Sequence, residues 1–377
     1  MLTADSRLRD FPSLADKAYL NTAAESIPPL CVKQALDDYW QDKTLGMKGR
    51  DGHFAKVEEC REIAARMIGL HMSEVSFCSC SSEAYNLLAS ALDLRTDDEV
   101  VVSDLDFPAG TTPWLTARLK PQLLVWQSCA GVLDVADLRG LLTERTRLVQ
   151  LSLVSFYNGY HLDWKVAVAL VRQLAPQAVV ALDVTQALGR IVLDCGEADI
   201  VISSTHKWTL GVHGGCVVGI PERAAERLTT TAGGWYHLAN AFDSDRFDRA
   251  VMKRGAASYS VGMPSFGPLY ALNASLRYLE KIGIKAISEY ANPLVQLAAD
   301  GLQQLGVELL APIDQRNQPT GIIAFKHPET VRIHAALEEA NVHVMHHAGR
   351  IRIAVHGYNT QENIERMLAV VRLALAR

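Results

Sequence analysis

The chain has 377 residues, of which 49% are hydrophobic, and a formal net charge of −5 at pH 7. A chain of this length and hydrophobic content can bury a large core and is expected to form two domains. The small net charge and the lack of a basic stripe argue against a nucleic-acid partner. They are compatible with small anionic ligands that bind at local sites.

No apolar run approaches the ~20 residues needed to cross a bilayer, and the N-terminus lacks the apolar region of a signal peptide. The seven cysteines are scattered and form no CxxC motif, which favours reduced intracellular thiols over a disulfide framework. Cys78 and Cys80 form the only close pair, and without a matching second pair we interpret them as structural. We therefore expect a cytoplasmic protein without membrane contact.

Strand and helix patterns alternate along the first part of the chain, which predicts a mostly parallel sheet covered by helices, an α/β fold. The expected strands are Val75–Cys78, Glu99–Ser103, Leu123–Trp126, Arg147–Leu153, Val179–Asp183, Ile200–Ser203 and Gly215–Gly219. The expected helices between them are Lys56–Ile68, Glu83–Ala91, Thr112–Leu119, Val135–Leu142 and Lys165–Leu174.

Between Thr229 and Ala257 the periodicity lapses into a long loop region, and such loops tend to be functional or flexible. A strong amphipathic helix at Gly267–Ile282 and a second long helix to about Leu305 follow. Strand and helix patterns then alternate again, at Gly321–Phe325, Val331–Ala340, Arg350–Val355 and Thr360–Ala376. We expect a large domain over residues 16–260, and a smaller α/β domain over residues 261–377 that also takes in residues 1–15.

Polar residues follow the ends of two neighbouring apolar runs within Val180–Trp208. Asp183 and Gln186 come at the end of the first run, and Ser204, His206 and Lys207 at the end of the second. Ligands of open α/β sheets bind at the carboxyl ends of the strands. These five residues are therefore predicted to surround a ligand.

Lys207 is the first candidate for chemistry, because its neighbours His206 and Trp208 would partly shield it from water. Desolvation disfavours the ammonium form and frees the amine as a nucleophile. The alternative is an ordinary solvated lysine. Asp183 needs a cationic or hydrogen-bonding partner if it is buried, and the protonated nitrogen of pyridoxal phosphate (PLP) is such a partner. The alternative is that Asp183 caps the following turn.

The segment DVTQALGRIVLD, followed by ADIVISSTHKW, resembles the class V aminotransferases, fold-type I PLP enzymes that include cysteine desulfurases, kynureninases and isopenicillin N epimerases. The D-x-x-Q and S-x-H-K motifs carry the resemblance, which extends over roughly Tyr19 to Leu373. It implies PLP as the cofactor and a fold-type I architecture, with a mostly parallel seven-stranded sheet flanked by helices and a smaller C-terminal α/β domain. It also implies a homodimer with the active site at the subunit interface.

Two motifs near the N-terminus resemble family segments around the cofactor. Tyr19–Pro29, YLNTAAESIPP, resembles the substrate-side segment, in which Asn21, Ala23 and Ala24 match. Ser81 and Ser82 begin SSEAYN, which resembles the T-T-E-A-x-N turn that opens a helix on the cofactor phosphate. Hydroxyls and free N–H groups at a helix N-terminus do form an anion site, although Ser-Ser-Glu alone is also an ordinary helix cap.

The resemblance also assigns residues to the ring and to the substrate. Phe107, in DLDFPAGTTPW, would stack on the pyridine face, where desulfurases use histidine; a core phenylalanine is the alternative. Gln186 would donate to the ring hydroxyl oxygen. The C-terminal RIAVHGYNT resembles the family's closing strand, whose arginine grips the substrate α-carboxylate bidentately. Arg352 takes that role by its spacing to Tyr358, and Arg350 is the competing candidate.

The mechanism that the family shares follows from these roles. Lys207 would hold PLP as an internal aldimine, and an incoming amino acid would displace it to form an external aldimine. Lys207 would then move the Cα proton to give a quinonoid, with Asp183 keeping the ring protonated. Ser204 and His206 would lie near the phosphate.

Three departures from the family pattern bear on the reaction. No cysteine lies beyond Cys216, so the persulfide route of desulfurases is not expected, whereas a C–S lyase that works by β-elimination needs no such cysteine. Met263 replaces a threonine that reaches the phosphate of the partner subunit's cofactor, so either Ser260 or Ser265 makes that contact or the contact is lost. Phe156 replaces an expected asparagine, and Asn158, two positions later, is its nearest substitute for binding substrate.

Three histidines before Arg352 could suggest a metal site, namely His343, His346 and His347. Hydrophobic residues between them and the lack of nearby acidic ligands favour a pocket-lining or surface role instead, so no metal is expected.

We expect an enzyme that acts on a small-molecule amino acid, with a keto acid as second substrate if it transfers the amino group. Transamination is the reaction we expect first. The alternatives are β-elimination from cysteine or cystine by a C–S lyase, and racemisation or epimerisation. A catalytically silent PLP-fold binding protein is the non-enzyme alternative. Lys207, Asp183 and Arg352 argue against it, because a silent relative has no chemical need for all three.

Overall fold

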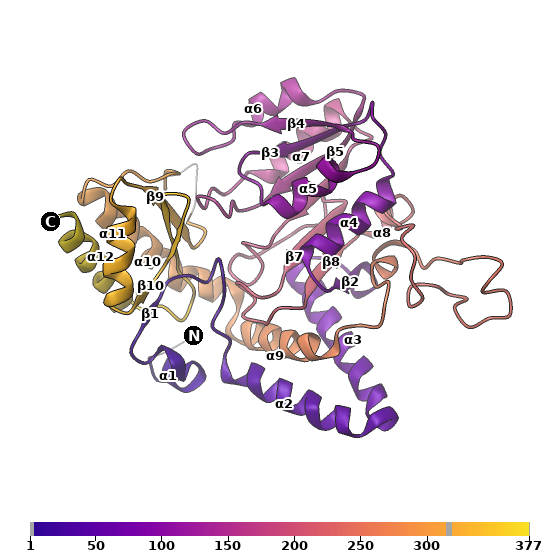
Figure 1. The fold of residues 1–377 in the computed structure, drawn as a ribbon, viewed down its shortest axis with the longest axis horizontal. Coiled ribbons are helices and arrows are strands. Elements are labelled where there is room, and N and C mark those ends of the chain that lie inside the picture. Colours follow the sequence, from indigo (N-terminus) through magenta and orange to yellow (C-terminus); the bar gives the residue numbers. More distant parts are fainter. Residues whose placement is uncertain (1–3, 314–318, 377) are drawn as a thin grey trace.

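A seven-stranded sheet forms the centre of the computed structural model, which describes residues 4–313 and 319–376 (Figure 1). Its strand order is β2-β8-β7-β6-β5-β3-β4. The strands are β2 (Val75–Cys78), β3 (Glu99–Ser103), β4 (Gln122–Trp126), β5 (Thr146–Ser152), β6 (Val179–Asp183), β7 (Ile200–Ser204) and β8 (Cys216–Gly219). Strands β4, β3, β5, β6 and β7 are parallel, and β8 is antiparallel to both of its neighbours. The predicted mostly parallel α/β sheet is confirmed.

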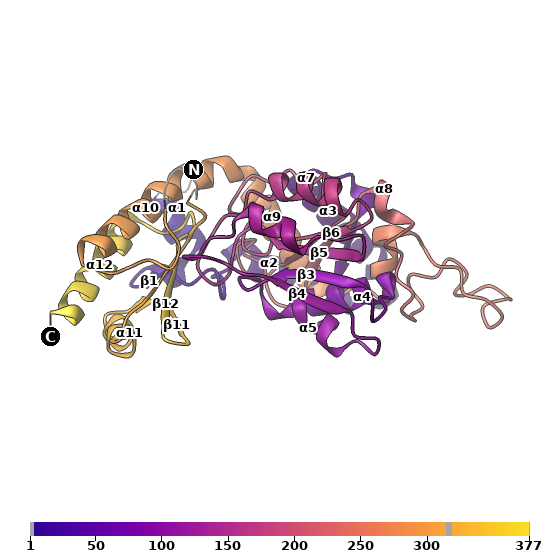
Figure 2. The ribbon, with the colours of Figure 1, turned by 90° about the horizontal axis from the view of Figure 1, so that it is seen from above.

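Helices cover both faces of this sheet, with α3 and α7 above it and α4 and α5 below it in Figure 2. The helices of this part of the chain are α2 (Leu30–Thr44), α3 (Arg50–Ile68), α4 (Ser81–Leu92), α5 (Pro108–Thr116), α6 (Val135–Leu138), α7 (Trp164–Leu174), α8 (Glu222–Ala225) and α9 (Phe266–Ile282). Alternate residues of β6 enter opposite cores: Val180 and Leu182 pack with α3 and α7, and Val179 and Ala181 with α4. Burial on both faces explains why these strands are continuous apolar runs.

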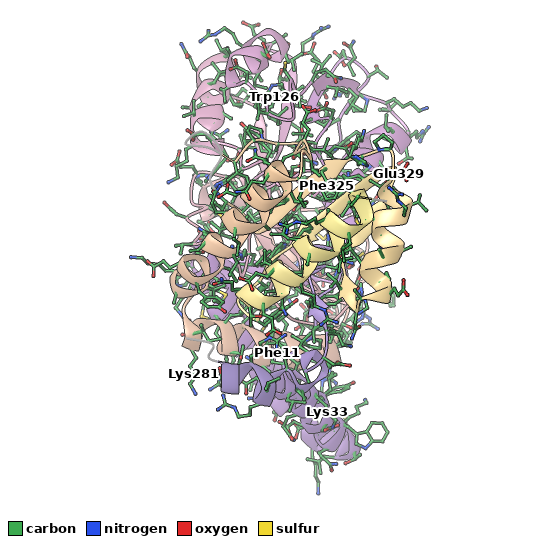
Figure 3. All side chains as sticks on the ribbon, turned by 90° about the vertical axis from the view of Figure 1, so that its left-hand side faces the viewer. Phe11, Lys33, Trp126, Lys281, Phe325 and Glu329 are labelled. Carbon is green, nitrogen blue, oxygen red and sulfur yellow. The ribbon has the colours of Figure 1, made fainter. Side chains whose placement is uncertain are left out.

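A second domain, at the left in Figure 1, has its own antiparallel sheet in the order β11-β12-β9. Its elements are α10 (Ile284–Gln304), β9 (Ile322–Lys326), α11 (Thr330–Glu339), β10 (Val342–His343), β11 (Met345–His347), β12 (Arg350–Ala354) and α12 (Gln361–Leu375). Figure 3 views this domain from outside, where its helices lie near Phe325, a fully buried side chain of β9. The N-terminal strand β1 (Ala18–Tyr19) pairs in parallel with β10.

The expected domain boundary at residues 260 and 261 precedes α9. Leu269, Leu272 and Leu276 of α9 belong to the core of the large domain, and the core of the second domain begins in α10 and includes Ala18. From this packing we propose a domain boundary at Gly283, between α9 and α10. The helix α1 (Ala4–Asp10) leads into a junction where Phe11, Leu279 and Tyr358 pack together, so the N-terminal segment contacts both parts.

The lapse in periodicity predicted a long loop region here, and residues 229–254 form a long arm that extends away from the sheet at the right of Figure 1. One isolated bridge, between Leu238 and Met252, joins its two sides. The aromatic side chains of Phe242 and Phe247 near its tip are 82% and 86% exposed. Within the described part of the chain, no helix is both long and apolar enough to cross a membrane.

Candidate active site

The carboxyl ends of β6 and β7 lie side by side, because these strands are parallel neighbours in the sheet. A cavity opens at this edge, where ligands of α/β sheets bind. Seven of the predicted site residues line it, and four further residues complete the lining. The predicted ones are Ser81, Phe107, Asp183, Gln186, Ser204, His206 and Lys207, and the others are Ser152, Val154, Phe156 and Thr185.

The amine of Lys207 is buried in this cavity beside an aromatic ring. Its Nζ lies 5.2 Å from the centroid of the Phe107 ring. Burial and the positive charge of Arg352 lower the pKa of Lys207 to about 8, and the carboxylate of Asp183 opposes this shift. The amine therefore loses its proton closer to neutral pH than an ordinary lysine does.

The Asp183 carboxylate is held from two sides at the end of β6. The Tyr85 hydroxyl donates to Oδ2 at 2.8 Å, and the Thr185 N–H donates to Oδ1 at 2.8 Å. The second bond is the turn cap that was the alternative role for this residue, so the carboxylate caps its turn and lines the cavity as well. These two bonds fix its orientation toward a ligand.

The N-terminal segment with Asn21, Ala23 and Ala24 lies beside the cavity without lining it. The Ala23 carbonyl accepts from Gln186 Nε2 at 3.1 Å, and Asn21 forms a bridge with Ala354 at the end of β12. The side-chain oxygen of Asn21 is buried without a partner. Through the Ala23 bond this segment fixes the position of the Gln186 amide.

His206 is linked to two groups that the sequence did not single out. Its ring stacks on His213 at a centroid distance of 4.0 Å, and His213 Nε2 lies 2.7 Å from a carboxylate oxygen of Glu25. Burial, with the charges of Lys207 and His213, lowers the pKa of His206 to about 4. The His206 ring is therefore neutral at pH 7.

One end of the cavity meets the start of helix α4. Ser81 is its first residue, and the preceding Cys80 makes no capping hydrogen bond through its side chain. The first N–H groups of a helix need partners from outside the helix and attract anions. Ser82 does not line the cavity: it is exposed, and its carbonyl accepts from the Asn86 amide at 2.8 Å.

Two arginines of β12 are buried behind one wall of the cavity. Nη1 of Arg352 donates to the carbonyl of Phe156 at 2.7 Å, and Phe156 lines the cavity. The Nε of Arg352 is buried without a partner. Burial and the positive charge of Arg350 lower the pKa of Arg352 to about 9, so it remains charged at neutral pH.

Asn158, expected to bind substrate, is committed to the backbone instead. Its amide nitrogen donates to the carbonyls of Gly131 and Leu310, and its oxygen accepts from the Tyr160 N–H. These bonds join the turn after β5 to two segments that are distant in the sequence. Phe156, two residues earlier, is the residue that lines the cavity.

The other open expectations concern residues outside the cavity. Ser260 bonds to Ser76 at 2.7 Å, and Ser265 is an exposed residue before α9. His343 lies 2.9 Å from a carboxylate oxygen of Glu338, and His346 and the exposed His347 lie on β11 in the second domain. No group of three or more metal-ligating side chains occurs among the described residues.

Asp106 is a buried acid that the sequence analysis missed. The Ser103 N–H donates to its Oδ2 at 2.7 Å, and its Oδ1 is buried without a partner. Burial raises the pKa of Asp106 to about 6, although the Ser152 hydroxyl and the Ser103 N–H oppose the shift. Since Ser152 lines the cavity, Asp106 stands directly behind the site.

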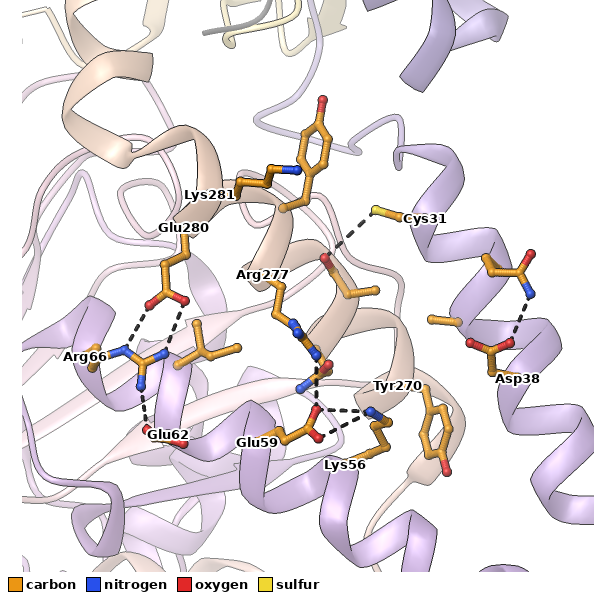
Figure 4. A pocket seen from close by; sticks show the side chains of 16 residues that line it. Cys31, Asp38, Lys56, Glu59, Glu62, Arg66, Tyr270, Arg277, Glu280 and Lys281 are labelled. Atoms are coloured by element: carbon orange, nitrogen blue, oxygen red, sulfur yellow. Dashed lines mark hydrogen bonds and ion pairs between the residues drawn. The ribbon is translucent and has the colours of Figure 1, made fainter. Parts of the chain in front are cut away.

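A larger hollow of about 800 Å³ lies between α2, α3 and α9 (Figure 4). Its side chains pair with one another across the helices: Arg66 bonds to both Glu62 and Glu280, and Glu59 to both Lys56 and Arg277. Mutually paired and largely exposed charges leave little to attract a ligand. The smaller cavity at the strand ends is therefore the candidate active site.

A sheet of this topology, with a buried lysine amine in a cavity at its strand ends, defines α/β enzymes that attach a carbonyl cofactor to a lysine. The groups present fit PLP. The Lys207 amine suits its aldehyde, the fixed Asp183 carboxylate suits its pyridine nitrogen, and the N-terminus of α4 suits its phosphate.

Residues 18–367 match the family model described as Aminotransferase class-V, and the chain belongs to this family. The uncharacterized aminotransferase YcbU of Bacillus subtilis (strain 168) is 27% identical over 358 residues, which cover 94% of this chain and 93% of the relative. The chain is a PLP-dependent enzyme of the transferase or lyase type.

Two solved structures have the same fold. The apo structure of a cysteine desulfurase from Thermococcus onnurineus NA1 superposes with a TM-score of 0.89 at 23% identity, covering 100% of this chain and 99% of the other. The cystine C–S lyase C-DES, solved with its reaction product cysteine persulfide, superposes with a TM-score of 0.87 at 21% identity, covering 96% and 99%.

Proposed function

We propose that this enzyme is an aminotransferase that acts on an amino acid and a keto acid. The observation that carries the proposal is the buried Lys207 amine. Burial and the Arg352 guanidinium lower its pKa to about 8, while the Asp183 carboxylate opposes this shift, so the amine is partly neutral near pH 8. The cofactor, when bound, supplies an electron sink for charge that develops at the substrate Cα. The chain's own residues do the rest.

Each residue has a distinct task in this proposal. Lys207 attaches the cofactor and then carries the proton to and from Cα. Asp183 keeps a proton on the pyridine nitrogen. Arg352 binds the α-carboxylate through N–H groups such as its unpartnered Nε, and so orients the Cα–H bond. Phe107 packs against the ring.

Other groups of the cavity are assigned to the cofactor's phosphate and to the hydroxyl oxygen of its pyridine ring. Ser81 and the N-terminus of α4 hold the phosphate, with help from Ser204 and the neutral His206. Gln186 has one amide N–H left for the ring oxygen, since the other donates to Ala23. Asn158 has no part in the proposal.

The titratable groups of the cavity favour transamination. Among the residues that line it, Asp183, His206 and Lys207 are titratable; Asp183 is held by two hydrogen bonds, and His206 is neutral at pH 7. Of these three groups, Lys207 has the pKa nearest to neutral pH for a base that takes up and returns a proton, because the pKa of His206 is lowered to about 4. Transamination moves a proton with a single carrier and expels no leaving group from the substrate side chain.

A C–S lyase is the second candidate, and the likeness to the cystine C–S lyase C-DES favours it. Residues 342–349, which precede the arginines, carry histidines and no cysteine, so a persulfide on this segment is not part of the proposal. An amino-acid screen with and without a keto acid separates the candidates. Turnover that depends on keto acid supports transamination, and pyruvate and sulfide from cysteine or cystine alone support the lyase.

We also propose a homodimer in which the arm of residues 229–254 contacts a second copy. Trp235 packs edge-on against Phe242 at 5.7 Å, and large exposed apolar groups mark interaction surfaces.

Seven free cysteines support a reducing compartment, and we propose the cytoplasm.

A further inference from the structure

Arg350 is a second buried guanidinium beside the active site, and the function proposed above gives it no task. It is 2% exposed, like Arg352, and its Nε has no hydrogen-bond partner. Its guanidinium lies over the Tyr157 ring at 4.0 Å and 5.8 Å from the centroid of the Phe156 ring. Among the described residues, no carboxylate forms an ion pair with it.

Two other buried arginines, Arg190 and Arg7, are anchored to backbone carbonyls, although Nη1 of Arg190 is also buried without a partner. Arg190 is completely buried, and it donates to the Val355 carbonyl and to the Asn292 side chain. Arg7 donates to the carbonyls of Tyr358 and Leu14. Burying a cation without such partners costs free energy that the fold does not recover. Arg350 differs from these two arginines because its polar partner is the Tyr157 side chain rather than a backbone carbonyl, and its Nε is available to a ligand.

Arg350 and Arg352 flank the same wall of the cavity. They are two residues apart on β12, so their side chains leave the same face of the strand, with Cα atoms roughly 6.6 Å apart. Arg352 bonds to the Phe156 carbonyl, and Arg350 lies over Phe156 and Tyr157. Two fixed positive charges on one wall match a ligand that carries two anionic groups.

We infer that the amino acid substrate has an acidic side chain, whose carboxylate binds Arg350 while Arg352 binds the α-carboxylate. The inference rests on the proposed function and names its substrate class. The planar guanidinium suits bidentate recognition of a carboxylate, and stacking on Tyr157 holds it in place. An apolar substrate side chain leaves this charge uncompensated and is disfavoured.

Matched four-carbon compounds test the inference in the holoenzyme. We expect kcat/KM for L-aspartate to exceed that for L-2-aminobutyrate by at least about tenfold, the effect of one charge-assisted hydrogen bond. Arg350→Met should bring this ratio to within about threefold through loss for aspartate alone. Arg350→Lys, which keeps the charge and loses the fork, should retain part of the preference. Lys326→Met is the matched control, because Lys326 is the exposed cross-strand neighbour of Arg350, and it should keep the full ratio.

Calorimetric binding of succinate and butyrate to the holoenzyme separates this inference from the proposed function. We expect succinate to bind at least about tenfold more tightly than butyrate in the wild type and about equally in Arg350→Met. Equal binding in the wild type, or equal losses for both amino acids in Arg350→Met, would overturn the inference. Absence of any keto-acid-dependent turnover would instead overturn the transaminase proposal and leave the binding result interpretable.

Discussion

The indole N–H of Trp208 donates to Oε1 of Gln186 at 2.6 Å, and both side chains are buried. This bond connects the residue after the reactive lysine to the turn that follows Asp183. The two strand ends that form the site are thereby fixed to each other by side chains as well as by the sheet.

Replacing Trp208 with phenylalanine tests this connection. The change leaves a buried amide oxygen without its donor, which should lower the free energy of unfolding by about 1–3 kcal/mol and weaken cofactor binding. Chemical denaturation and cofactor titration measure the two effects. In a double-mutant cycle with Gln186→Leu the two losses should not add; strict additivity would show that the bond has no energetic role.

The titration of Lys207 should control attachment of the cofactor. Since its pKa is about 8, the rate at which the apoenzyme captures cofactor should rise with pH through that value, as the amine loses its proton. Arg352→Met removes a charge that lowers this pKa, so the midpoint should move to higher pH. Stopped-flow absorbance across a pH series gives the midpoints for the wild type and for Arg352→Met. Lys207→Ala is the negative control, because it cannot bind the cofactor covalently. An unchanged midpoint in Arg352→Met would contradict the coupling.

Asp106 should make stability depend on pH. Its pKa is raised to about 6, so the folded state binds this proton more tightly than the unfolded state. Its contribution therefore favours folding at low pH and is lost as the pH rises through about 6. Asp106→Asn stays neutral and keeps an acceptor for the Ser103 N–H. At pH 8 it should be more stable than the wild type by up to about 3 kcal/mol, with the difference disappearing near pH 4. Denaturation curves at both pH values measure this, and a constant difference would reject the assignment.

The aromatic arm should be required for dimerisation. Phe242→Asp combined with Phe247→Asp places two charges on the proposed contact and should shift the protein toward monomer in sedimentation equilibrium. Val331→Asp on α11 is the matched control, because Val331 is 69% exposed and lies in the second domain. If the double variant sediments like the control, the arm does not hold two copies together.

The sequence located the strands of the central sheet to within one residue because all of them except the edge strand β4 are mostly buried on both faces and leave continuous apolar runs. The same feature located Asp183 and Ser204, the polar residues at which those runs stop. Helix α2 was not predicted, since Val32 is its one buried residue among the described side chains and a mostly exposed helix has little apolar periodicity. The periodicity of α9 revealed an apolar face but not which core that face would enter.

The remaining features of the site depend on how distant parts of the chain are placed in the fold. Asn158 matched the family approximately, but the orientation of its amide depends on the carbonyls of Gly131 and Leu310, which are distant in sequence. His213 and Asp106 reach the site only through His206 and Ser152. The sequence does not distinguish a buried arginine that is anchored to a backbone carbonyl, such as Arg190, from one that is not, such as Arg350.

Ser26 donates both its N–H and its hydroxyl to the carbonyl of His206, at 3.1 and 3.0 Å. A few residues earlier, the same stretch pairs with β10 and bridges to Ala354 at the end of β12. The stretch from Ala18 to Ser26 is therefore a short tether with one end on the domain that carries the arginines and the other on the loop that carries Lys207. Any hinge motion of the second domain pulls on this tether, so its length limits how far Arg352 can travel from the reactive amine during a catalytic cycle.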